Sequence, residues 1–124
     1  MQGFIPYGKQ TINNDDINAV SKALKNNFLT TGPGVELFEK EFSKKVKSKY
    51  SVSSNSGTSA IILALKAINL KKNDVVVLPS INFIAAANIS KIMGAKIVFS
   101  DVDKNSGQMT PQKFEQCVKK NKLK

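Results

Sequence analysis

The chain has 124 residues, which is enough for one domain at most, and 41% of them are hydrophobic. Its nineteen basic residues, all Lys, and nine acidic residues give a net charge of +10. Because His is absent and Cys117 is the only Cys, the chain itself cannot assemble a catalytic triad with His, a Cys–His metal site or an internal disulfide.

Two amphipathic helices are expected in the first 46 residues. Asn14 can cap a helix whose apolar residues recur with helical spacing, and Asn26 and Asn27 end it. A loop over residues 28–34 contains Thr30, Thr31 and Gly32 and leads into a second helix. The apolar face of that helix is formed by Val35, Phe38, Phe42 and Val46.

From Lys49 onward, the pattern alternates between short strands and helices. We expect strands at 50–53, 74–78 and 96–100, and helices at 56–68, 82–93 and from Thr110 onward. Strands joined by crossover helices run parallel, so the sequence predicts an α/β fold with helices covering the sheet. Three strands leave open edges and an incomplete core, which is typical of the first part of a larger domain. No internal domain boundary is expected.

The strongest local signal for chemistry is the small-residue run 53–60, between a predicted strand and a predicted helix. Gly57 permits close backbone approach, and the hydroxyls and free N–H groups of a helix start suit a phosphate. A Ser or Thr helix cap without a ligand explains the same residues. The residues alone leave both interpretations open.

Three further features have a plain structural interpretation beside a functional one. Phe83 follows the second strand and can stack on a flat cofactor, or it can pack in the core. Asp101 and Asp103 follow the third strand and suggest a metal only weakly, so a loop cap is favoured. Cys117 is expected to be a buried small hydrophobic residue rather than a nucleophile.

Taken in order, five segments resemble the amino-terminal third of the DegT/DnrJ/EryC1/StrS sugar aminotransferases. Within that family the chain is most similar to enzymes of the UDP-4-amino-4,6-dideoxy-N-acetyl-altrosamine transaminase type. The resemblance covers nearly the whole chain. The segments are Pro6-Tyr7-Gly8, Phe28-Leu29-Thr30-Thr31-Gly32-Pro33 with Val35 and Phe38-Glu39, residues 55–60, residues 79–88 and residues 94–103.

The resemblance implies a fold-type-I enzyme of three α/β/α layers that uses pyridoxal 5′-phosphate (PLP). It would carry an amino group from glutamate to a nucleotide-linked 4-keto-6-deoxy sugar. By the same resemblance, cofactor binding falls to Ser56, Gly57 and Thr58 at the phosphate and to Phe83 on the pyridine ring. The sugar-nucleotide side is lined by Tyr7, Phe28, Thr30, Thr31 and Gly32.

The family's Schiff-base Lys and the Asp at the pyridine nitrogen fall beyond Lys124. The resemblance therefore implies that residues 1–124 are the amino-terminal portion of the PLP-binding domain and hold no catalytic residue. It also implies a homodimer. We expect no metal, nucleic-acid or membrane partner. A cytoplasmic location is expected because the amino terminus lacks a signal-peptide pattern and one Cys forms no internal disulfide.

Two alternatives stay open. A PLP-dependent keto-sugar dehydratase of the same fold differs at the position of the catalytic Lys, which this sequence does not include. A basic, non-catalytic α/β module that binds nucleotides would need clustered Lys and exposed aromatic residues. The Lys residues are instead dispersed, and the Phe residues have core spacing.

Overall fold

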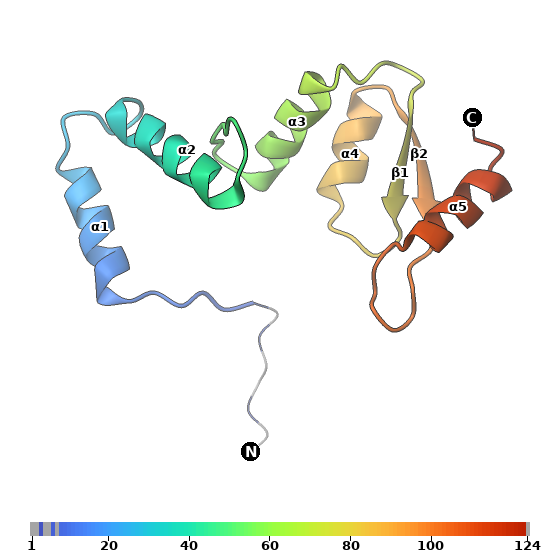
Figure 1. Ribbon diagram of the computed structural model, residues 1–124, viewed down its shortest axis with the longest axis horizontal. Coiled ribbons are helices and arrows are strands. Elements are labelled where there is room, and N and C mark those ends of the chain that lie inside the picture. Colours follow the sequence, from blue (N-terminus) through green and yellow to red (C-terminus); the bar gives the residue numbers. More distant parts are fainter. Residues whose placement is uncertain (1–2, 4–5, 7, 124) are drawn as a thin grey trace. The chain divides into compact units, whose positions relative to one another are not determined.

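The computed structural model describes Gly3, Pro6 and residues 8–123, which divide into two compact units, Met1–Ser53 and Ser54–Lys124. Figure 1 labels the elements in chain order. The first unit contains α1 (Asn14–Leu24) and α2 (Pro33–Val46). The second contains α3 (Gly57–Ala67), β1 (Val75–Pro79), α4 (Ala85–Ile92), β2 (Lys96–Ser100) and α5 (Pro111–Lys120).

Both predicted helices of the first unit are present. The cap of α1 is Asn13 rather than the expected Asn14, which is the first residue of the helix. The cap is reciprocal, because Asn13 Oδ1 accepts the backbone N–H groups of Asp15 and Asp16 while Asp16 Oδ2 accepts that of Asn13 at 2.9 Å. Pro33 occupies the first position of α2, where its missing N–H costs nothing. Lys47 ends α2 in the left-handed conformation.

The predicted strand at 50–53 is wrong, because this segment forms no strand. The described sheet contains β1 and β2 alone, so no strand lies beside residues 50–53. Their polar groups bond to α2 instead. Ser51 Oγ donates to Glu39 O, and Glu39 Oε1 accepts both the N–H of Ser53 at 2.7 Å and its hydroxyl at 2.9 Å.

The second unit is built on the parallel pair of β1 and β2, whose register runs from Val75 opposite Lys96 to Pro79 opposite Ser100. The N–H of Ser80 donates to Ser100 O at 2.8 Å and extends this pairing beyond β1. Both strands contact α4, which also packs against α3, and β2 contacts α5 (Figure 1). The predicted α/β class is confirmed, with two parallel strands in place of three. The helix expected from residue 82 begins three residues later, at Ala85.

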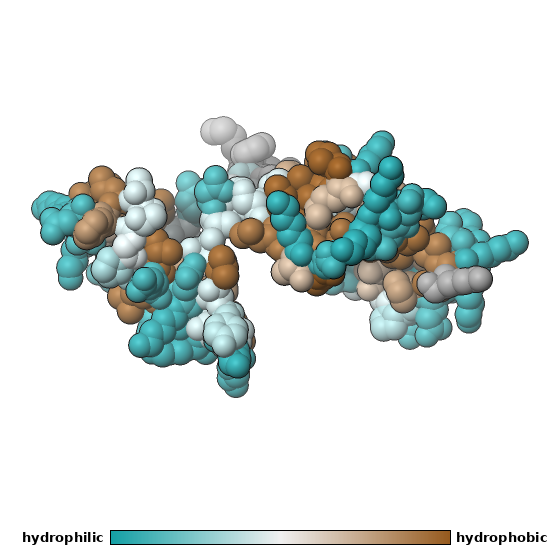
Figure 2. All heavy atoms as spheres, turned by 90° about the horizontal axis from the view of Figure 1, so that it is seen from above, coloured by the Kyte–Doolittle hydropathy of each residue, from teal (hydrophilic) through white to brown (hydrophobic). Residues whose placement is uncertain are grey.

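Burial is confined to the second unit of the described chain. Its buried residues are Ala85, Ser90, Ala95, Ser100 and Cys117. Large apolar side chains of both units stay exposed, and Figure 2 shows hydrophobic residues as brown surface. This agrees with the expectation of an incomplete core. Among the described helices, none combines the length and the apolar character needed to cross a membrane.

Candidate functional site

The first turn of α3 is made of the small residues that the sequence analysis singled out. Ser56 is its N-cap, and the Ser56 hydroxyl accepts the N–H of Ser59 at 3.1 Å. The carbonyl of Ser56 accepts the N–H of Ala60 at 3.0 Å. These bonds occupy the third and fourth N–H groups of the helix, and the first two N–H groups remain without a hydrogen bond.

Three donors at this turn have no partner within the described residues: the N–H groups of Gly57 and Thr58 and the hydroxyl of Thr58. Gly57 is exposed and Thr58 is half-buried. A Cβ added at Gly57 would meet no atom within 4 Å, so the backbone is uncrowded on that side of Gly57. The turn contains no acidic residue, and a helix start carries partial positive charge. This donor set fits a phosphate group.

Phe83 lies in the short loop between β1 and α4. Asn82 Oδ1 accepts the N–H of Phe83 at 2.8 Å. Phe83 is 76% exposed, so the described residues do not bury it. The ring borders a hollow of about 120 Å³ together with Leu78 and Phe99. An exposed aromatic face at the carboxyl end of a parallel strand can stack on a flat ring.

The residues expected on the sugar side belong to the first unit. Tyr7 lies outside the described residues. Phe28, Thr30 and Thr31 lie in the loop between α1 and α2, and Phe28 and Thr31 help to line a hollow of about 650 Å³ there. Gly32 has a φ of +115°, and a Cβ on it would lie 2.9 Å from Phe28 Cβ. Only Gly fits this turn against Phe28 without strain.

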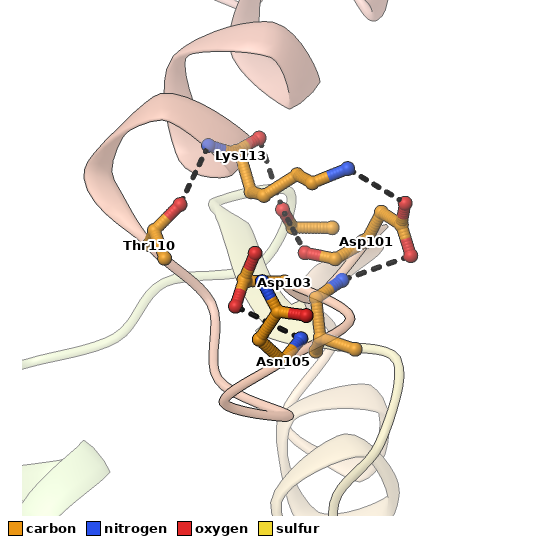
Figure 3. A network of polar contacts seen from close by, with 7 residues as sticks. Asp101, Asp103, Asn105, Thr110 and Lys113 are labelled. Carbon is orange, nitrogen blue, oxygen red and sulfur yellow. Dashed lines mark hydrogen bonds and ion pairs between the residues drawn. The ribbon is translucent and has the colours of Figure 1, made fainter.

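The Asp101–Asp103 segment is a loop cap, as the sequence favoured (Figure 3). Asp103 Oδ1 accepts the N–H groups of Asn105 and Ser106 and the hydroxyl of Ser106. Asp101 Oδ2 pairs with Lys113 Nζ at 3.0 Å. This pairing with Lys113 lowers the pKa of Asp101, with help from a bond donated by the N–H of Val102. No group of three candidate metal ligands occurs in the described part of the chain.

Cys117 is buried, as expected, with its thiol 3.7 Å from Phe99 O. Asn55 and Ser59, which lie in the small-residue run 53–60 and were not singled out within it, both belong to the hydrogen-bonded network at the start of α3. Ser59 Oγ donates to Asn55 Oδ1 at 2.7 Å and accepts from Ser56 Oγ at 3.0 Å. The signal in the sequence is the run of hydroxyl residues on both sides of Gly57.

Residues 10–123 match the DegT/DnrJ/EryC1/StrS aminotransferase family. The spore coat polysaccharide biosynthesis protein SpsC of Bacillus subtilis (strain 168) is 38% identical over 115 residues, which are 93% of this chain and 30% of SpsC. The chain therefore spans about a third of the length of this relative.

The chain is similar to solved structures of sugar-modifying enzymes, two of which illustrate the range. Spr1654 of Streptococcus pneumoniae, solved in PLP and PMP forms, has a TM-score of 0.80 and 26% identity over 92% of this chain and 29% of its own. The GDP-4-keto-6-deoxy-D-mannose-3-dehydratase of E. coli, with bound hydrated PLP, has a TM-score of 0.74 and 27% identity over 82% of this chain and 28% of its own. Because the family match extends over nearly all of the sequence, the chain belongs to the DegT/DnrJ/EryC1/StrS aminotransferase family.

Proposed function

We propose that the chain is the amino-terminal part of a PLP-dependent aminotransferase that transfers an amino group from glutamate to a nucleotide-linked 4-keto-6-deoxy sugar. Family membership supports the reaction class, and the name of SpsC supports a role in polysaccharide biosynthesis. The observation that carries the proposal is the set of three unpaired donors at the start of α3.

In this proposal Gly57 and Thr58 hold the cofactor phosphate. Their N–H groups and the Thr58 hydroxyl would donate to phosphate oxygens, and the partial positive charge of the helix start would favour the dianion. Ser56 would contribute as the N-cap that shapes the turn, since its hydroxyl oxygen accepts the N–H of Ser59. Phe83 would stack on the pyridine ring and shield it from water. When bound, PLP supplies the electron sink that lets an amino group be carried between two substrates.

The sugar nucleotide would be bound by Tyr7 and by Phe28, Thr30, Thr31 and Gly32. A loop with an exposed aromatic ring and two hydroxyls suits a ligand that carries both a sugar and a base. The narrower substrate, a UDP-linked N-acetylhexosamine, rests on the sequence resemblance. The complete enzyme would be a cytoplasmic homodimer whose active sites lie at the subunit interface.

We further propose that residues 1–124 supply one part of the cofactor site. The Lys that reacts with the cofactor and the Asp at its pyridine nitrogen would come from a part of the enzyme to which the 124 residues do not correspond. Activity is therefore a property of the complete enzyme, and cofactor contact is the property to test in this chain.

A keto-sugar dehydratase is the second candidate, because the E. coli dehydratase is among the similar structures. The two reactions share the cofactor and differ in its protein partners. An assay of the complete enzyme separates them: amino transfer from glutamate supports the aminotransferase, and deoxygenation of the sugar without net amino transfer supports the dehydratase.

Cofactor contact can be tested by titrating the 124-residue chain with pyridoxamine 5′-phosphate while recording amide resonances. This ligand has no aldehyde and does not modify the Lys residues. We expect the Gly57 and Thr58 amides to shift, with pyridoxamine lacking the phosphate as the control. Thr58→Val should weaken binding because it removes the hydroxyl, and Phe83→Leu because it removes the ring. Unperturbed Gly57 and Thr58 amides would contradict the proposed phosphate site.

A further inference from the structure

The outer edge of β2 carries backbone groups that β1 does not use. The N–H of Lys96 donates to Asp74 O at 2.8 Å where the strand pair begins, and Ser100 O accepts the N–H of Ser80 at 2.8 Å where it ends. The bonds of a parallel pair involve every second residue of a strand, so alternate residues of β2, counted from Lys96, face β1. The residues between them direct their N–H and C=O groups away from β1.

These intervening residues are Ile97 and Phe99. Within the part of the chain that the structure describes, their N–H groups and the carbonyl of Ile97 have no hydrogen-bond partner. The carbonyl of Phe99 has only the thiol of Cys117, at 3.7 Å, and a thiol is a weak donor. A strand edge with such a row of free groups can pair with another strand.

Helix α5 lies beside this edge and forms the wall of a groove (Figure 1). Ser100 Oγ donates to Lys113 O near the start of α5, and Cys117, one turn later, bonds to Phe99. The helix therefore runs antiparallel to β2, and its last turn lies toward the start of the strand. Between strand and helix is a hollow of about 500 Å³, which we call the β2–α5 groove. It is lined on the strand side by Ile97 and Phe99 and on the helix side by Lys113, Cys117 and Lys120.

The charges of the β2–α5 groove favour an anionic occupant. At one end, Lys113 Nζ pairs with Asp101 Oδ2 at 3.0 Å, so these two charges offset each other. Lys120, on the last turn of α5, is exposed and forms no ion pair with any described residue. The net charge of +10 adds a long-range attraction for acidic partners and a repulsion between copies of this chain.

We propose that the β2–α5 groove binds an extended acidic peptide segment of a partner protein, which adds a strand to the edge of β2 and places a carboxylate at Lys120. Backbone bonds to Ile97 and Phe99 supply affinity in this mode of recognition, and the Lys side chain selects the charge of the segment. The carbonyl of Phe99 exchanges the thiol of Cys117 for a backbone N–H, which is a stronger donor. This interaction does not depend on the proposed cofactor site.

The probe is a short peptide of alternating Glu and Val, matched to β2 in length, acetylated at one end and amidated at the other. Its titration into the 124-residue chain should shift the amide resonances of Ile97 and Phe99 more than that of Val98, whose N–H faces β1. The control peptide has Lys in place of Glu and should leave these resonances unchanged.

Two N-methylated forms of the acidic peptide distinguish strand addition from attraction between charges. Each form is methylated on one of the two alternating sets of amides. Only one set faces β2 in an added strand, so one form should lose binding and the other should retain it. Attraction between charges alone would leave the two forms equal.

A matched pair of charge reversals tests the role of Lys120. Lys120→Glu should weaken binding of the acidic peptide roughly threefold to tenfold, because an attractive charge becomes a repulsive one. Lys119→Glu makes the same change of net charge on the same turn of α5, but Lys119 does not line the groove. This control should bind within about twofold of the original chain, because salt screens exposed charges that are not in contact. Circular dichroism checks that α5 is retained in both variants.

The proposal is supported if the acidic peptide alone shifts Ile97 and Phe99, if one methylated form loses binding, and if Lys120→Glu binds more weakly than Lys119→Glu. It is overturned if the acidic peptide causes no shift, if both methylated forms bind equally, or if the two variants have equal affinity. Shifts of Ile97 and Phe99 that appear when the protein is concentrated without peptide would assign the groove to a second copy of the chain, and would also overturn it.

Discussion

Asp103 shows how one carboxylate oxygen can organise a loop. Its Oδ1 accepts the N–H of Ser106, the hydroxyl of Ser106 and the N–H of Asn105, and these bonds lower the pKa of Asp103 below its usual value. A carboxyl group with a lowered folded-state pKa stabilises the fold above its unfolded-state pKa. That contribution is lost as the pH falls through the folded-state pKa.

The first prediction concerns acid sensitivity. We expect the free energy of unfolding to decrease as the pH falls from about 5 to about 2, and Asp103→Asn to show a smaller decrease because the amide does not titrate. Urea unfolding followed by circular dichroism at several pH values measures this. An unchanged pH dependence in Asp103→Asn would mean that the loop bonds do not favour the charged form.

A second prediction separates backbone strain from crowding at two glycines. Gly94 has a φ of +86°, and a Cβ added there would lie 3.1 Å from Lys72 Cγ. Gly107 has a φ of +68°, and a Cβ added there would have no atom within 4 Å. Gly107→Ala should cost about 1 kcal/mol for the left-handed backbone alone. Gly94→Ala should cost more, because Lys72 must also move. Equal losses in chemical denaturation would show that crowding adds nothing.

At the scale of elements, hydrogen bonds to Glu39 of α2 take the place of the strand pairing that residues 50–53 lack. Its backbone carbonyl and its carboxylate bond to Ser51 and Ser53. The bond from the N–H of Ser53, followed by that from its hydroxyl, lowers the pKa of Glu39. The side chain of α2 therefore orders this segment without a sheet.

The third prediction follows from this contact. Glu39→Ala should increase the amide exchange rate of Ser53, because its N–H loses its acceptor. Glu39→Gln keeps an oxygen in place and should have a smaller effect, since a neutral acceptor forms a weaker bond than a carboxylate. Amide exchange by nuclear magnetic resonance measures both, and the amides of α5 serve as the internal control. Equal exchange of Ser53 in all three forms would contradict the proposed anchoring.

Local patterns predicted the helices well and the first of the three expected strands badly, for a physical reason. Apolar spacing and caps are contained within each helix, so Thr110 marks the start of α5 directly, and the cap expected at Asn14 is displaced by only one residue, to Asn13. A strand depends on a neighbour, and the segment 50–53 bonds to α2 instead. The small-residue turn at Gly57 was visible in the sequence. The hydrogen bond from the Ser59 hydroxyl to Asn55 Oδ1 was not, because it depends on the direction of a single hydroxyl.

For the whole molecule, the balance between buried and exposed apolar surface determines whether the chain self-associates in solution. Five residues of the described chain are buried, all small. Phe38 and Phe42 stack at 5.9 Å on α2 and remain 58% and 48% exposed. Apolar surface of this extent favours association (Figure 2).

The fourth prediction is that the 124-residue chain self-associates at micromolar to millimolar concentration and binds a hydrophobic dye. Replacing Phe38 and Phe42 by Ser should reduce both, whereas replacing Glu36 and Lys40 by Ser on the same helix should not. Sedimentation velocity and dye fluorescence report the difference. A monodisperse monomer with protected amides throughout would contradict the expectation.

Cys117 is the single thiol of the chain, and it lies on α5, where it is buried against β2. A thiol reagent reaches it only when α5 moves away from the strand, so the rate of alkylation measures how often that helix undocks. No label or engineered residue is needed. The alkylation rate of the buried thiol therefore measures how often α5 separates from β2. The measurement needs no ligand and can be made in every variant that keeps Cys117.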